Sequence, residues 1–130
     1  MSVEWGDQYS VGHEPFDEHH KSMVRIIDQM TELAQKGDDH AGWVARIDEL
    51  ITLSIKHFTE EEAELERRGY AELIDHQDEH RNLLNELLEI RGRYSEKGSK
   101  PSLEITEFLA NWMAVHVGET DARYRPLFKK

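Results

Sequence analysis

Residues 57–66 read HFTEEEAELE, a highly charged stretch in which two polar side chains fall on an apolar helical line. His57 and Glu61 are four residues apart, and Leu65 continues the same spacing. Residues spaced by three or four share one face of an α-helix, so these polar groups lie on the face that packs inward. The stretch predicts a helix whose core-facing side carries an imidazole and a carboxylate.

The same spacing recurs in four segments separated by Gly- or Pro-containing connections. We expect helices over residues 17–35, 40–67, 71–91 and 101–121. Asp17 is expected to start the first of them. Short connections favour antiparallel neighbours, so the sequence predicts an all-α protein, an antiparallel up-down-up-down four-helix bundle. An N-terminal extended arm over residues 1–15 and a tail over residues 122–130 complete a single domain over residues 1–130.

Composition limits the classes of function. The chain has 130 residues, a net charge of −11 and no cysteine. The length suits one domain, and the acidity argues against nucleic acid or anionic membranes as partners. The first 20 residues contain no apolar run, and no stretch is long enough to cross a bilayer. We therefore expect a cytoplasmic monomer without a membrane segment.

Polar residues interrupt the inward-facing lines of all four predicted helices. Because consecutive helices of such a bundle run in opposite directions, these residues are expected to lie together at one end of the bundle. Asp121 fits least well, because a step of five residues from His116 leaves the ideal α-helical line. The set consists of His20, His57, Glu61, His76, His80, His116 and Asp121.

This set predicts a metal site. Hydrogen bonding among neutral histidines is the alternative, but burying so many unpartnered polar groups would cost several kcal/mol each, against about 5–15 kcal/mol of total stability. Imidazole and carboxylate without thiolate suit iron, zinc or manganese. Seven ligands are too many for one ion. With two carboxylates and an oxygen bridging two six-coordinate ions, one coordination position stays open.

The motifs that carry these residues resemble those of the hemerythrins, and in particular the single-domain bacterial forms. The resemblance covers nearly the whole chain. It rests on four stretches in order: VEWGDQYSVGHEPFDEHHK (3–21), HFTEEE (57–62), HQDEH (76–80) and WMAVHVGETDARY (112–124).

The resemblance implies reversible O₂ binding at a non-haem, oxo- or hydroxo-bridged pair of iron ions. One iron would be held by His76, His80 and His116, and the other by His20 and His57. Glu61 and Asp121 would bridge both irons, and the iron with two histidines would keep the open position.

The family's apolar oxygen pocket maps to four residues, Met23, Trp112, Met113 and Val117. The family more often has Leu or Ile at three of these positions. His19 is a second departure, because Gln is common before the ligand; we expect His19, His13 and His40 on the surface. Tyr124 is expected either to support the Asp121 end or simply to cover the core.

Several functions compete. The favoured interpretation is an O₂ carrier, store or supplier that is not an enzyme and has no catalytic residues, with an acceptor protein that the sequence does not identify. The alternatives are an O₂ or redox sensor acting through a separate partner, and a di-iron enzyme acting on peroxide or nitric oxide. Iron storage would normally need a cage-forming surface, which the sequence does not reveal.

Overall fold

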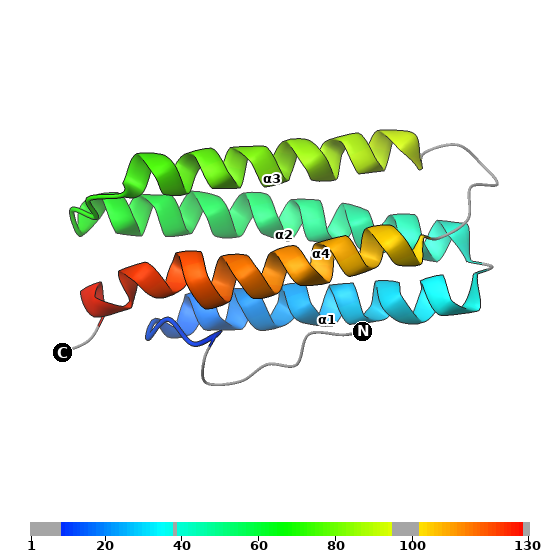
Figure 1. Ribbon diagram of the computed structural model, residues 1–130, viewed down its shortest axis with the longest axis horizontal. Coiled ribbons are helices and arrows are strands. Elements are labelled where there is room, and N and C mark those ends of the chain that lie inside the picture. Colours follow the sequence, from blue (N-terminus) through cyan, green and yellow to red (C-terminus); the bar gives the residue numbers. More distant parts are fainter. Residues whose placement is uncertain (1–8, 38, 95–101, 129–130) are drawn as a thin grey trace.

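The computed structural model describes residues 9–37, 39–94 and 102–128 and contains four long α-helices (Figure 1). They are α1 (Glu14–Lys36), α2 (His40–Arg67), α3 (Leu73–Arg93) and α4 (Leu103–Val115). α4 continues into a π-helix, η2 (His116–Thr120), and a 3-10 helix, η3 (Asp121–Leu127). The described residues include no strand, which confirms the all-α prediction.

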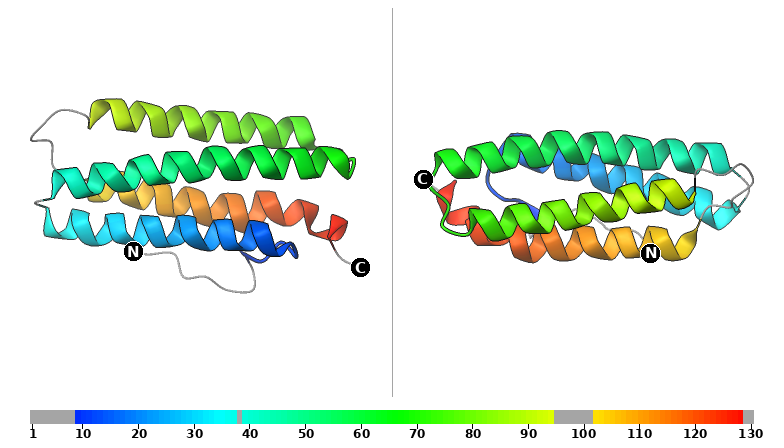
Figure 2. Two further views of the ribbon diagram at one scale, coloured as in Figure 1. Left: turned by 180° about the vertical axis from the view of Figure 1, so that it is seen from behind. Right: turned by 90° about the horizontal axis from the view of Figure 1, so that it is seen from above.

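The helices lie side by side and alternate in direction along the chain, as the views of Figures 1 and 2 agree. α1 packs against both α2 and α4, and α2 also packs against α3. The up-down-up-down four-helix bundle is therefore confirmed. None of the helices within the described ranges is long and apolar enough to span a membrane.

Side chains and glycine fix several helix ends. Ser102 caps α4 by accepting a hydrogen bond from the Ile105 N–H at 3.1 Å. Asp39 caps α2 by accepting from the Gly42 N–H at 2.9 Å. Gly37 ends α1 in the left-handed conformation, with φ of 73°. These ends set the axial position of the residues farther along each helix.

The prediction that α1 starts at Asp17 is wrong. α1 begins at Glu14, because Pro15 fits the second helical position, where no intrahelical N–H bond is needed. Asp17 instead accepts hydrogen bonds from the Val11 N–H and the Ser10 hydroxyl, both at 2.8 Å. These bonds tie residues 10 and 11 of the predicted arm to α1, whereas residues 1–8 of that arm lie outside the described residues.

The bundle interior divides along its length. One half, which we call the apolar half, is filled by side chains at most 2% exposed: Met30, Trp43, Ile47, Leu87, Ile90 and Leu109. The other half, the site half, contains the seven polar residues singled out above. A small apolar cluster of Val11, Phe16, Leu65 and Tyr124 packs at the end of the site half.

Candidate metal centre

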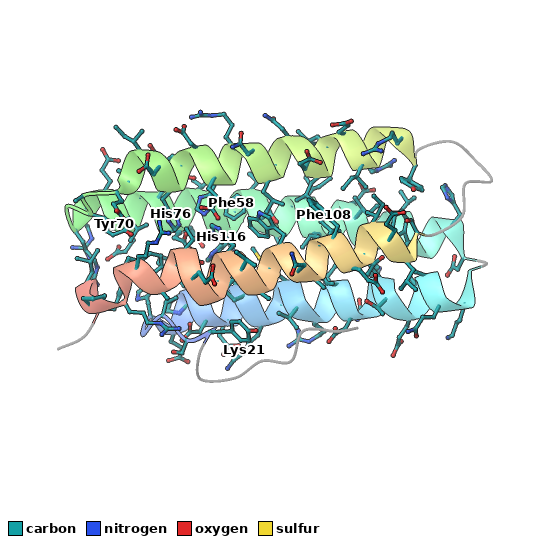
Figure 3. The ribbon with its side chains drawn as sticks, viewed as in Figure 1. Lys21, Phe58, Tyr70, His76, Phe108 and His116 are labelled. Atoms are coloured by element: carbon teal, nitrogen blue, oxygen red, sulfur yellow. The ribbon has the colours of Figure 1, made fainter. Side chains whose placement is uncertain are left out.

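The fold brings all seven predicted ligands together inside the site half. Each of their side chains is at most 2% exposed. Figure 3 shows two of them, His76 and His116, between the helices near the end where α2 turns into α3. α1 contributes one residue, α2 two and α3 two, while the segment after α4 contributes His116 and Asp121.

The seven residues form two overlapping groups, each with ligand atoms within 4.8 Å of one another. The first group contains three imidazoles, from His76, His80 and His116. The second group contains two imidazoles, from His20 and His57. Glu61 and Asp121 belong to both groups, so the arrangement could hold two cations that share two carboxylates.

Glu61 faces both groups with different oxygens. Its Oε1 lies 2.5 Å from His76 Nε2 and 3.2 Å from His80 Nε2. Its Oε2 lies 2.9 Å from His57 Nε2. The i, i+4 spacing of His57 and Glu61 on α2 places both inside the bundle, as the opening stretch predicts.

Asp121 repeats this pattern from the opposite side. Its Oδ1 lies 3.0 Å from His76 Nε2 and 3.1 Å from His116 Nε2. Its Oδ2 lies 3.2 Å from His20 Nε2. Neither oxygen has a donor in good hydrogen-bond geometry despite these short distances. The carboxylate is therefore surrounded by three imidazole nitrogens, an arrangement in which a shared cation could bind it together with them.

A π turn explains how Asp121 reaches the interior. The fourth helix is expected to continue to about Asp121, with a bend at its end or a leaning side chain needed to bring Asp121 inward; the regular α-helix in fact ends at Val115, and the bend follows it. In η2 the Asp121 N–H bonds to the His116 carbonyl, an i→i+5 step that returns the chain to the same face after five residues. The bend needed for this ligand is therefore built into the backbone.

Two carboxylates that the sequence analysis missed support the three-imidazole group. Glu62 Oε2 lies 2.9 Å from His80 Nδ1, and Glu79 Oε1 lies 2.6 Å from His116 Nδ1. The Thr120 hydroxyl also donates to Glu79, at 3.1 Å. A carboxylate only accepts, so both Nδ1 atoms carry hydrogen, which leaves the Nε2 atoms facing the centre as the positions where a proton or a metal ion can bind.

This tautomer makes the donor set fit a cation. The Nε2 atoms of His80 and His116 are 3.2 Å apart, too close for two lone pairs without positive charge between them. Glu61 and Asp121 add negative charge at the same place. The chemistry of these donors therefore fits metal binding, with the outer nitrogens held by hydrogen bonds as is usual for ligating histidines.

The pKa values reflect the same excess of negative charge. Burial alone would lower the pKa of His116, but the nearby Asp121 carboxylate raises it to about 10. Burial is likewise outweighed at His76, where contacts with Asp121 and Glu61 raise the pKa to about 9. At Glu61, burial opposes ionisation, yet His57 and the other imidazoles hold its pKa well below the usual value. The centre therefore attracts positive charge, either as protons or as metal ions.

His19 contradicts its predicted surface position. Its side chain is only 17% exposed, and its Nδ1 lies 2.9 Å from Nδ1 of His57. The α-helical spacing of the inward line points to His20 and gives no indication that its neighbour would turn toward α2. His13 and His40 are both partly exposed, and the His13 ring packs 4.4 Å from that of Phe16.

Aromatic side chains enclose the ligands. Tyr124 is fully buried, so it covers the core as one of its two expected roles has it, and it donates a hydrogen bond to Glu61 Oε2 at 2.9 Å rather than to Asp121. Phe58 stacks on His80 with ring centroids 3.8 Å apart, and Trp112 stacks on His116 at 4.5 Å. Phe58 lies between His57 and the acidic residues in the motif, but only the structure shows its stacking role.

A small cavity of about 10 Å³ adjoins the site half. It is lined by Met23, Trp112 and Met113, three of the four predicted pocket residues, whereas buried Val117 does not line it. The lining residues that the sequence analysis did not include are Ile27, Leu50, Ser54, Leu83, Leu87 and Leu109. The cavity is almost entirely apolar.

Comparisons with known proteins identify the family and agree with the fold. The family model described as "Hemerythrin HHE cation binding domain" matches residues 11–128. Bacteriohemerythrin of Pseudomonas aeruginosa (strain LESB58) is 30% identical over 92% of this chain and 77% of its own length. Bacteriohemerythrin of Methylococcus capsulatus is 24% identical over 85% of this chain and 83% of its own length. A crystal structure of wild-type hemerythrin superposes with a TM-score of 0.90, at 21% identity over 98% of both chains. The chain belongs to the hemerythrin family.

Proposed function

We propose that this protein binds O₂ reversibly at a pair of iron ions held by the seven clustered residues, and that it carries, stores or supplies O₂. The observation that carries the proposal is the unequal division of the imidazoles. One group has five protein donors and the other has four, with both carboxylates common to the two. The choice of iron as the metal and of O₂ as the bound molecule comes from the resemblance to the hemerythrin family.

The unequal division of the imidazoles makes the two ends of the centre different. The three-imidazole group would hold its ion with His76, His80 and His116. The two-imidazole group, with His20 and His57, offers one fewer protein donor. We therefore place O₂ on the side of His20 and His57. Bound ions would supply the electrons and the coordination position that O₂ needs, and the side chains of this protein would hold the ions and exclude water around them.

The adjoining cavity suits a small apolar molecule. Its lining begins one helical turn farther into the bundle than the ligands and extends for about one turn more: Met23 follows His20 by three residues, and Ile27 follows it by seven. A volume of about 10 Å³ is at the lower limit for one water molecule. Water needs two or more polar partners, which this lining scarcely offers, so the cavity favours a diatomic gas over water.

The lining also favours binding over catalysis. Among the described residues that line the cavity, none carries a carboxyl or imidazole group, and the polar atoms come from the Ser54 hydroxyl and the Trp112 indole. An enzyme acting on peroxide or nitric oxide would benefit from a proton donor here. Reversible binding instead benefits from keeping protons away.

The test is an optical titration of the reduced, iron-loaded protein with O₂, followed by reversal under argon. Elemental analysis should give two irons per chain. A visible absorption band should appear with O₂ and disappear on its removal. One metal per chain, or no reversal, would contradict the proposal, and rapid turnover of peroxide or nitric oxide would favour the enzyme.

A pair of variants tests the cavity. Met113→Ala should enlarge it, admit water and speed the decay of the oxygenated spectrum while iron content stays unchanged. Met30→Ala is the matched control, because Met30 is also buried but does not line the cavity. Equal decay rates in the two variants would show that Met113 does not protect the O₂ site.

A further inference from the structure

We propose that Glu60 and His19 form a positioning chain behind His57, which fixes the tautomer and the ring orientation of His57 toward the metal centre. The inference rests on the proposed function, since it concerns residues around the same centre. The inference goes beyond that function, because it assigns a role to two residues that are not among the seven ligands.

The geometry begins at the two nitrogens of His57. Nε2 points into the centre, 2.9 Å from His20 Nε2 and 2.9 Å from Glu61 Oε2. Nδ1 points the other way and lies 2.9 Å from Nδ1 of His19. At that distance two imidazole nitrogens share one hydrogen, so one ring must donate and the other accept.

Metal binding decides which ring donates. A ligating Nε2 needs its lone pair, so the hydrogen of His57 must sit on Nδ1 and point to His19. His19 then accepts on Nδ1 and carries its own hydrogen on Nε2. That Nε2 lies 3.4 Å from Glu60 Oε2, so its hydrogen faces a carboxylate. Every contact of the chain Glu60–His19–His57 therefore has matching polarity.

The opposite placement of the two hydrogens would be expected if His57 did not bind metal. If His19 donated from Nδ1, the hydrogen of His57 would sit on Nε2 and point to Glu61. His57 would then be a hydrogen-bonded core histidine and not a ligand. The tautomer of His57 thus separates the two descriptions of this pair.

The positioning chain behind His57 differs from the hydrogen-bond partners that back the three-imidazole group. His80 and His116 are backed by the carboxylates of Glu62 and Glu79, whereas His57 is backed by an imidazole. The support on the two-imidazole side is therefore uncharged at its point of contact. Glu60, at the outer end, is 49% exposed, so its influence on His57 should be weaker than that of His19.

Zinc is a suitable probe, because it is diamagnetic and takes imidazole and carboxylate ligands. Nitrogen-15 NMR of the zinc-loaded wild type should show His57 with hydrogen on Nδ1 and His19 with hydrogen on Nε2. Release of zinc to a chelator should be about 10- to 100-fold faster in His19→Ala. His19→Gln should restore slow release, because the Gln carbonyl can accept from His57 Nδ1–H. Glu60→Gln should give a smaller acceleration.

The matched control is His13→Gln, because His13 lines the same surface groove as His19 and Glu60 but contacts Phe16 and Phe128. Its release rate should equal that of the wild type. Thermal melts would confirm that each variant is folded. If His19→Ala also releases zinc at the wild-type rate, or if His19 carries its hydrogen on Nδ1, the positioning chain is wrong.

The outcomes separate this inference from the proposed function. Expected tautomers and release rates, combined with no reversible O₂ binding by the iron-loaded protein, would overturn only the proposed function. Reversible O₂ binding with unaltered release in His19→Ala would overturn only the positioning chain. A wild type that takes up no metal at these residues would overturn both.

Discussion

The two halves of the bundle are built on the same helices with the same spacing, yet they are filled in opposite ways. In the apolar half, Thr106 is fully buried but accepts a hydrogen bond from the Trp43 indole at 3.2 Å and donates to the Ser102 carbonyl at 2.8 Å. In the site half, the oxygens of Asp121 lack such partners. The apolar half can thus be stable by burial alone, whereas the site half depends on added positive charge.

Metal removal should have the largest effect on this contrast. A ligand present at 1,000 times its Kd stabilises the folded state by about 4 kcal/mol, which corresponds to a Tm shift of about 10 °C or more at this chain length. Hydrogen exchange should accelerate in the site half first. An unchanged Tm, with metal loss verified by elemental analysis, would mean that the site half is stable without metal.

Glu61→Ala should break the site half from within. It removes the carboxylate common to both groups, so iron content should fall at both positions. The buried imidazoles would lose their counter-charge, at a cost of about 3–5 kcal/mol. His20→Ala, which touches only the two-imidazole group, should retain more iron. Full iron content in Glu61→Ala would refute a shared role.

Ile47→Ala probes the apolar half. Ile47 is fully buried, and its truncation should cost about 2–5 kcal/mol through lost contacts and the cavity left behind. Iron content at saturation should not change. Urea unfolding of loaded and metal-free protein should give the same loss in both states, and a loss seen in only one state would show that the two halves are coupled.

Acid and base should act oppositely on the two metal states. In the metal-free protein, the pKa values of His76 and His116 are raised from 6.5 to about 9 and about 10. Their contribution to stability is therefore complete below pH 6.5 and is lost as pH rises through about 9–10, at up to about 1.4 kcal/mol per pH unit for each group. The loaded protein should instead lose stability in acid, where protons displace metal. The test is to measure the unfolding free energy of both forms between pH 5 and 10. If stability changes with pH in the same direction in the metal-free and the loaded protein, this prediction is wrong.

Tyr124→Phe should give the smallest effect. It removes the hydrogen bond to Glu61 Oε2 while keeping the buried ring, so a loss of about 1–2 kcal/mol is expected. The loss should be larger in metal-free protein, where Glu61 has fewer other partners. Tyr70→Phe is the comparison, because the Tyr70 hydroxyl contacts the exposed Glu72 and should be nearly neutral.

Only some of the site residues could be placed from the sequence alone. The i, i+4 pairs His57–Glu61 and His76–His80 could be placed inward because an α-helix repeats every 3.6 residues. Asp121 could only be placed by its motif, because a π turn leaves no periodic signal. Glu62 and Glu79 were missed because residues beside an inward line resemble solvated charge. His19 was assigned to the surface for the same reason.

The π turn also limits how this centre can be transplanted. A designer could copy the positions on α1, α2 and α3 onto ideal helices of another bundle, since their spacing needs no special backbone. The fourth helix would not transfer in this way: an ideal helix with the same five-residue spacing would rotate the carboxylate away from the histidine. Such a scaffold must either reproduce the wider turn over residues 116–120 or shorten the spacing to four and accept a new position for the carboxylate.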